Sequence, residues 1–167
     1  MSIGLHAQNL SLRDSLVDRL AQRNYVTGSL IVTGLYQGPL QIDPQYSDYA
    51  QLLPLLREED LFPLFRHDSL AVAAFAFKAA VERFPHSVVP MLRTESAQPR
   101  AGRFPDFLNT CQGTVMKTLF DFMLGEIWLQ MKTGKLELSK EDLQTYEAIK
   151  TAHRTGPASE KDVPEGF

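Results

Sequence analysis

Cysteine is almost missing from this chain, since Cys111 is the only one among its 167 residues. A single sulfur can form neither an intrachain disulfide nor a thiolate metal cluster, which fits a reducing compartment. No two of the four histidines have the four-residue spacing of a helical metal site. These histidines are His6, His67, His86 and His153. The sequence therefore predicts no bound metal and no cofactor.

Long apolar runs are missing as well. The longest uncharged stretch, residues 25–42, is interrupted by Gly28, Gly34, Gly38 and Pro39. A bilayer span needs about 20 mainly apolar residues, so this stretch does not qualify. The first residues lack the basic segment and apolar run of a secretory signal. We therefore expect a soluble, cytoplasmic protein without a membrane partner.

An excess of positive charge is also lacking. The chain has 17 Lys and Arg against 20 Asp and Glu, a net charge of −3, which argues against a nucleic-acid partner. One local exception is a predicted loop over 93–103, where Arg93, Arg100 and Arg103 face only Glu95. Such a loop could hold an acidic partner, a phosphate or RNA. Without interleaved aromatic residues, however, a solvated loop is the stronger interpretation.

Motifs of catalysis are absent from the sequence. It contains no glycine-rich phosphate loop, no dinucleotide fingerprint and no nucleophile elbow. Residues far apart in sequence can still converge in space, so this observation lowers the expectation of an enzyme without excluding one. We favour a non-enzymatic function.

What the chain does contain is enough apolar sequence for one core. Its apolar fraction of 44% predicts a single domain over 1–154, followed by a disordered tail over 155–167. Two long apolar helices are predicted, over 69–84 and 107–132. The expected fold is mainly α, with α+β as the alternative, and has a small β-hairpin near residues 29–42.

Shorter elements follow from caps and prolines. Asp43 and Pro44 resemble the first residues of a helix, and Ser139 with Asp142 resembles a capping box. Proline lacks an N–H, so it interrupts helices and is confined to edge strands. The further predicted elements are a helix over 12–23, breaks at Pro54 and Pro63, an edge strand over 87–92 containing Pro90, and a helix ending at Arg154.

Glu126 is the main anomaly of the second long helix. On a straight helix it lies among apolar side chains, where a carboxylate needs a partner or takes up a proton. It is therefore a candidate ligand-binding residue, with His67 or Tyr46 nearby. Two structural alternatives are favoured over this one: a buried but paired Glu126, or a kink at Gly125 that turns Glu126 to water.

Charged residues flank a short aromatic segment, which contains Phe62 and Phe65 and is followed by Arg66 and His67. Large aromatics and arginine often anchor protein interfaces. The alternative, which we favour, is that both phenylalanines enter the core. The same choice applies to Trp128 and its neighbouring methionines, which form either a core stripe or an adaptable groove.

Three functions remain open at this point. The leading hypothesis is a protein-interaction protein: an adaptor, an immunity or inhibitor protein, or a subunit of a larger assembly. Its partner would be another protein or a second copy, bound through Phe62, Phe65, Arg66 and the three arginines of the 93–103 loop. The alternatives are a small-ligand site or small enzyme using a buried Glu126 with His67, and nucleic-acid binding through that loop.

Overall fold

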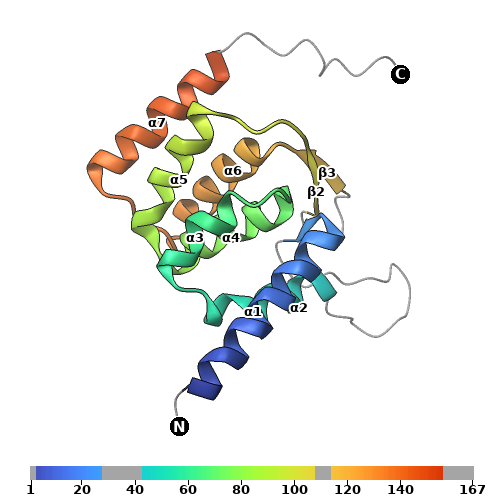
Figure 1. The fold of residues 1–167 in the computed structure, drawn as a ribbon. Helices are drawn as coiled ribbons and strands as arrows, with labels where there is room; N and C mark the ends of the chain where they lie inside the picture. Colours follow the sequence, from blue (N-terminus) through green and yellow to red (C-terminus); the bar gives the residue numbers. More distant parts are fainter. Residues whose placement is uncertain (1–2, 28–42, 108–113, 156–167) are drawn as a thin grey trace, which may run out of the picture.

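The computed structural model describes residues 3–27, 43–107 and 114–155, which are mainly α-helical with a small sheet (Figure 1). In chain order the elements are α1 (Ile3–Arg23), β1 (Val26–Thr27), α2 (Pro44–Leu52), a 3₁₀ turn (Leu53–Leu55), α3 (Glu58–Phe65), α4 (Leu70–Arg83), α5 (Pro85–Ala97), β2 (Phe104–Phe107), β3 (Thr114–Lys117), α6 (Leu119–Lys132) and α7 (Lys140–Thr155).

The central element is α4, which contacts α1, α3, α5, α6 and β1. The Ser69 hydroxyl accepts the backbone N–H of Val72 and caps the helix. Every side chain from Ala71 to Val81 is buried, because neighbours cover all sides of the helix. Burial of one phenylalanine, such as Phe77, contributes about 1.5–3 kcal/mol. The prediction of a buried helix over 69–84 is confirmed.

The predicted helix starts at Asp43 and Ser139 are present. The Asp43 carboxylate accepts the backbone N–H groups of Gln45 and Tyr46, and Pro44 is the first helical residue of α2. The Ser139 hydroxyl accepts the backbone N–H of Asp142 at the start of α7. Both side chains satisfy donors that a helix leaves unpaired at its first turn.

An ion-pair network joins α1 to α2. The Asp48 carboxylate accepts hydrogen bonds from the guanidinium groups of Arg19 and Arg23. Burial alone would raise the pKa of Asp48, but these two hydrogen bonds outweigh burial and lower the pKa below its ordinary value of 3.8. Helix α1 then ends at Asn24, whose φ of 49° lies in the left-handed region.

The sheet has the order β1–β2–β3 and lies beside the C-terminal end of α1. Strand β2 pairs parallel to β1, with Asp106 opposite Val26, and antiparallel to β3. The prediction of a helix from Phe107 is therefore wrong over its first part, since α6 begins only at Leu119, after its cap Thr118. Pairing with β1, far away in the sequence, keeps this segment extended, and a local pattern cannot reveal such pairing.

Two other local predictions are also wrong. The segment over 87–92, predicted as an edge strand, belongs to α5, and so does the first half of the predicted 93–103 loop. Pro90 lies on the exposed side of α5, while Val88 and Leu92 are buried on the other side. Pro63 does not interrupt α3, because Leu61 and Phe65 hold that helix against α4. The break at Pro54 is present as the 3₁₀ turn.

The remaining predictions concern the N-terminal helix, the hairpin and the tail. Helix α1 contains the predicted 12–23 helix and begins at Ile3. The hairpin near 29–42 and the tail beyond Thr155 lie outside the described residues. Within the part of the chain that the structure describes, no helix is both long and apolar enough to cross a membrane.

Candidate functional site

A buried lysine joins α4 to α6. The side chain of Lys78 is only 8% exposed, and its Nζ lies 3.0 Å from Oε1 of Glu82 and 3.4 Å from Oε1 of Glu126. Glu82 is one helical turn further along α4, and Glu126 is on α6. We call these three residues, together with Tyr49 of α2, the Lys78 cluster. It places one buried ammonium group between a mostly buried carboxylate, that of Glu126, and an exposed one, that of Glu82.

Glu126 is itself mostly buried, since its side chain is 10% exposed. Its Oε1 also accepts a hydrogen bond of 2.8 Å from Gln130 Nε2. Helix α6 continues through Gly125 and Glu126 stays mostly buried, so the alternative in which Gly125 turns Glu126 to water is wrong. The structure therefore agrees with the other structural alternative, in which the Glu126 carboxylate is buried and paired. Its Oε1 thus has both a cation and an amide donor within the protein, which compensates for the burial of its charge.

Tyr49 completes the cluster from α2. It is 2% exposed, its ring stacks on Phe75 at a centroid distance of 4.8 Å, and its hydroxyl has no hydrogen-bond partner among the described residues. Burial raises the pKa of Tyr49 far above its ordinary value, and the nearby charge of Glu82 raises it further. The phenol therefore stays protonated.

The Lys78 amine keeps its charge beside the two carboxylates. Burial alone would lower the pKa of Lys78, but the charges of Glu126 and Glu82 outweigh burial and raise the pKa above its ordinary 10.5. An amine that stays protonated at neutral pH cannot act as a base or as a nucleophile. A pocket of about 480 Å³ opens beside Lys78, Glu82 and Tyr49.

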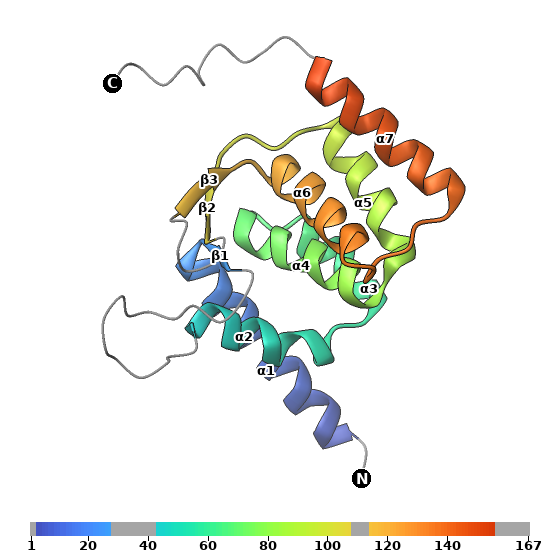
Figure 2. The ribbon, with the colours of Figure 1, turned by 180° about the vertical axis from the view of Figure 1, so that it is seen from behind.

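A second feature is an exposed tryptophan on α6. Figure 2 shows α6 beside α4 and α5, with α7 packed on α5. Trp128 is 49% exposed and lies between two grooves. The groove toward the sheet measures about 320 Å³ and reaches Asp106 and Lys117, while the groove toward α7 measures about 300 Å³ and reaches Tyr146.

Gly125 and Leu129 extend this surface. Gly125 lines both grooves, and a Cβ placed on it would meet nothing within 4 Å. Leu129 is exposed beside Trp128, and Lys132 Nζ lies 4.7 Å from the centre of the Trp128 ring. We call Gly125, Trp128, Leu129 and Lys132 the Trp128 surface. The favoured interpretation of the sequence placed Trp128 in the core, and that interpretation is wrong.

Cationic side chains surround the two grooves. They are Lys117, Lys132, Lys150 and Arg154. Lys117 pairs with Asp106 at 2.7 Å and Lys150 with Glu147 at 3.0 Å. Lys132 and Arg154 form no ion pair within the described residues. The acidic side chains of the grooves, Asp106, Asp121 and Glu126, each have a cationic or histidine partner. The Trp128 surface is therefore apolar at its centre, with the two cations Lys132 and Arg154 left over at its edge.

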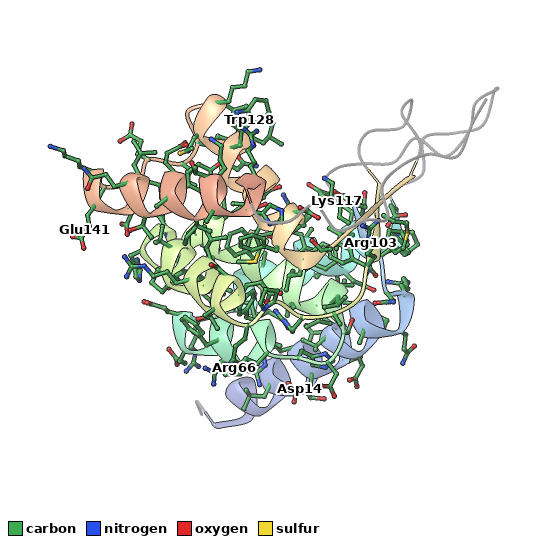
Figure 3. All side chains as sticks on the ribbon, turned by 90° about the horizontal axis from the view of Figure 1, so that it is seen from above. Asp14, Arg66, Arg103, Lys117, Trp128 and Glu141 are labelled. Atoms are coloured by element: carbon green, nitrogen blue, oxygen red, sulfur yellow. The ribbon has the colours of Figure 1, made fainter. Side chains whose placement is uncertain are left out.

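The segment with Phe62 and Phe65 faces the core. Phe65 is fully buried, so the favoured interpretation is confirmed for it and the alternative of an exposed anchor is wrong, and Phe62 is half-buried against the core. Arg66 is exposed, but Figure 3 shows it at the opposite edge of the molecule from Trp128. Phe65 is buried because α3 packs on α4, which the short charged segment around it does not reveal.

The three predicted arginines differ in their surroundings. Arg93 lies on α5 and donates to the hydroxyl of Thr145 at 2.9 Å. Arg100 pairs with the buried Glu95 at 3.0 Å and stacks on the ring of Phe65, so it is drawn inward. Arg103 is exposed near β2. The structure thus does not present them as one solvated loop.

The described histidines form hydrogen bonds away from Glu126. His67 Nδ1 accepts the backbone N–H of Ser69 at 3.0 Å, just before α4, and it shares no partner with Glu126. His153 of α7 bonds to Asp121 of α6 at 2.9 Å. Within the described ranges, no group of three or more His, Cys, Asp or Glu side chains has the geometry to hold a metal ion.

Comparison of this chain with known protein families, with curated proteins and with solved structures gives no match. Its function therefore has to be argued from its own surfaces. The sequence pattern marked Glu126, and Gly125 only as a possible kink, but it did not mark Lys78 as a site residue. A usable signal was present, because Lys78 and Glu82 stand four residues apart at the end of an otherwise apolar helix.

Proposed function

We propose that this protein is a non-enzymatic interaction protein that binds a partner protein through the Trp128 surface. The observation that supports this most strongly is the half-exposed Trp128 between two grooves. Tryptophan is enriched among residues that dominate binding energy, particularly where neighbouring pockets accept groups from the partner. It is also the only tryptophan of the chain.

Gly125 adds a second argument. A glycine inside a helix costs up to about 1 kcal/mol relative to alanine. Nothing within 4 Å would obstruct a Cβ at this position, so packing within the protein does not require glycine. A glycine in both grooves permits close approach by another chain. The partner we infer would lie across α6 with its backbone near Gly125.

The charge at the edge of the surface indicates the kind of partner. Two copies facing each other across this surface would bring two cationic edges together, which is repulsive. A different protein with apolar anchor residues and acidic side chains would be complementary. The proposed partner is therefore an acidic protein segment, and self-association is the less favoured alternative.

Affinity purification from the source cells, followed by mass spectrometry, tests the proposal. Wild type, Trp128→Ala and Leu12→Ala are compared, where Leu12 is an exposed leucine of α1 and serves as the control. The partner should be lost with Trp128→Ala and retained with Leu12→Ala. With the purified partner, Trp128→Ala should weaken binding by about 2 kcal/mol or more. Equal recovery with all three proteins would contradict the proposal.

A further inference from the structure

A cavity of about 510 Å³ lies between α1, the segment that joins α2 to α3, and the end of α4. Its volume is within the usual range of small-molecule sites. Its charged lining residues are Arg13, Arg57, Asp60 and Arg83, and we call it the arginine cavity. Figure 3 shows Asp14, which follows Arg13 in the sequence, at the opposite edge of the molecule from Trp128. The arginine cavity is therefore separate from the Trp128 surface.

The lining of the arginine cavity has an excess of positive charge. Three guanidinium groups stand against one carboxylate, that of Asp60, so the lining has a net charge of +2 in a chain whose overall charge is −3. Both oxygens of Asp60 already accept hydrogen bonds, Oδ1 from Arg13 at 2.6 Å and Oδ2 from the backbone N–H of Arg57 at 2.9 Å. The lining therefore attracts an anion and repels a cation.

Arg83 is held beside Arg57 by the protein backbone. Its Nη1 donates to the carbonyls of Leu53 and Leu56, and Leu56 directly precedes Arg57 in the sequence. Among the described residues, Arg83 forms no ion pair. Neutral acceptors thus fix its guanidinium group at the cavity, and no carboxylate compensates for its positive charge.

Two acidic residues pair with the other arginines but do not line the cavity. Asp14 pairs with Arg13 and Glu59 with Arg57, and the side chains of the two acids are 67% and 70% exposed. Ion pairs that are this exposed to water contribute little. Arg57 is itself exposed, so its guanidinium group is accessible to a ligand.

The charge and geometry of the lining select a phosphate group. Guanidinium groups bind phosphate and carboxylate oxygens through paired N–H donors. A phosphate monoester has three terminal oxygens and a charge near −2 at neutral pH, which matches the +2 of the lining, whereas a carboxylate has two oxygens and a charge of −1. We propose that the arginine cavity binds a small phosphate monoester, with its phosphate at Arg57 and Arg83 and its remaining part along Leu10 and Pro54, which also line the cavity.

Four aromatic probes of similar size test this assignment on the full chain by isothermal titration calorimetry at low ionic strength. Phenyl phosphate has a charge near −2, phenyl sulfate and benzoate have −1, and phenol is neutral. Phenyl phosphate should bind most tightly, the two single anions about tenfold or more weakly, and phenol should not bind. The affinity for phenyl phosphate should rise from pH 5 to pH 7, because its phosphate loses a proton there, whereas that for phenyl sulfate should not rise.

Variants locate the binding. Arg57→Gln and Arg83→Gln should each weaken phenyl phosphate binding about tenfold or more, because each removes a charge-assisted hydrogen bond. Arg66→Gln is the control, since it removes the same charge from an exposed arginine outside the cavity, and it should bind like wild type. Arg83 also holds the backbone near Leu56, so Arg57→Gln decides the test if Arg83→Gln does not fold.

Two outcomes would overturn the assignment: phenyl phosphate that binds no more tightly than phenyl sulfate and benzoate, or binding that Arg57→Gln weakens no more than Arg66→Gln does. The result is independent of the proposed partner interaction. Trp128→Ala should keep phenyl phosphate binding, and Arg57→Gln should keep partner capture. Failure of one proposal can therefore be told apart from failure of the other.

Discussion

At the residue scale, Lys78 shows how one charge is kept inside an apolar helix. Its neighbours on α4 are buried, so the ammonium group has lost most of its water. Glu82 and Glu126 replace that water with charge-assisted contacts. Replacing both members of such a pair by apolar groups can be neutral, whereas removing one member leaves an uncompensated buried charge. The cost of a substitution therefore depends on which charges remain.

Lys78→Met should destabilise the protein by about 3 kcal/mol, because Glu126 then keeps a buried charge without a cation beside it. Urea denaturation followed by circular dichroism measures this change in the free energy of unfolding. The double variant Lys78→Met with Glu126→Met should recover part of the loss. A single variant as stable as wild type would show that the ion pair contributes nothing.

Asp48 predicts a dependence of stability on acid pH. Its pKa in the folded protein is lowered below 3.8 by hydrogen bonds from Arg19 and Arg23, which outweigh the effect of burial. A carboxyl whose pKa is lowered by folding contributes stability above its unfolded pKa, about 3.9, and loses that contribution as the pH falls through the folded pKa. Wild type should therefore be more stable than Asp48→Asn at pH 6.

This difference in stability should become smaller below pH 4. The urea midpoints of both proteins, measured from pH 6 down to pH 3, test this expectation. A difference that stays constant over this range would contradict it.

At the element scale, α6 has two faces with different roles. Its buried face carries Phe122, Met123 and Ile127 into the core, and its outer face presents the Trp128 surface. Gly125 stands on the outer face, where helix stability alone would favour alanine. Gly134, just beyond the helix, has a φ of 70° and so a conformation that glycine adopts readily.

Gly125→Ala should stabilise the protein by about 0.5–1 kcal/mol, since alanine is the better helix former and its Cβ has free space. Gly134→Ala is the matched control. It should destabilise by about 1 kcal/mol, because a Cβ is strained in the left-handed region although space is also free there. Thermal and urea denaturation measure both variants.

Measuring partner binding distinguishes the effect of Gly125 on helix stability from its proposed effect on the interface. Under the proposed function, Gly125→Ala should weaken capture of the partner while raising stability. A variant that is more stable and binds the partner as wild type does would remove Gly125 from the proposed interface.

At the scale of the whole molecule, α4 connects most of the structure. Its contacts reach α1, α3, α5, α6 and β1, so the apolar residues on these elements form one continuous cluster. A single core of this kind is expected to unfold in one cooperative transition. Trp128 on α6 and the backbone signal of all helices should then report the same event.

Phe77→Ala tests this cooperativity, because Phe77 is fully buried on α4. The variant should lose about 3–5 kcal/mol, the usual cost of a large cavity in a core. Tryptophan fluorescence and far-ultraviolet circular dichroism should give coincident transitions for both wild type and variant. Separate transitions would show that the chain folds as two units.

Local sequence patterns were sufficient for several elements of this fold. The buried helix over 69–84 and the starts of α2 and α7 follow from periodicity and from side chains that cap their own helix. Glu126 also stood out locally, because helical spacing alone places it among apolar residues. These features depend on residues within a few positions of each other, so the sequence by itself determined them.

Only the tertiary structure decided the rest. The segment around Phe107 became a strand through pairing with β1, and the 87–97 segment became helical through burial against α4. The cationic partner of Glu126 is 48 residues away on another helix, and exposure of Trp128 depends on which side of α6 the core covers. Contacts between segments that are distant in the sequence determine these features, so a short stretch of sequence cannot predict them.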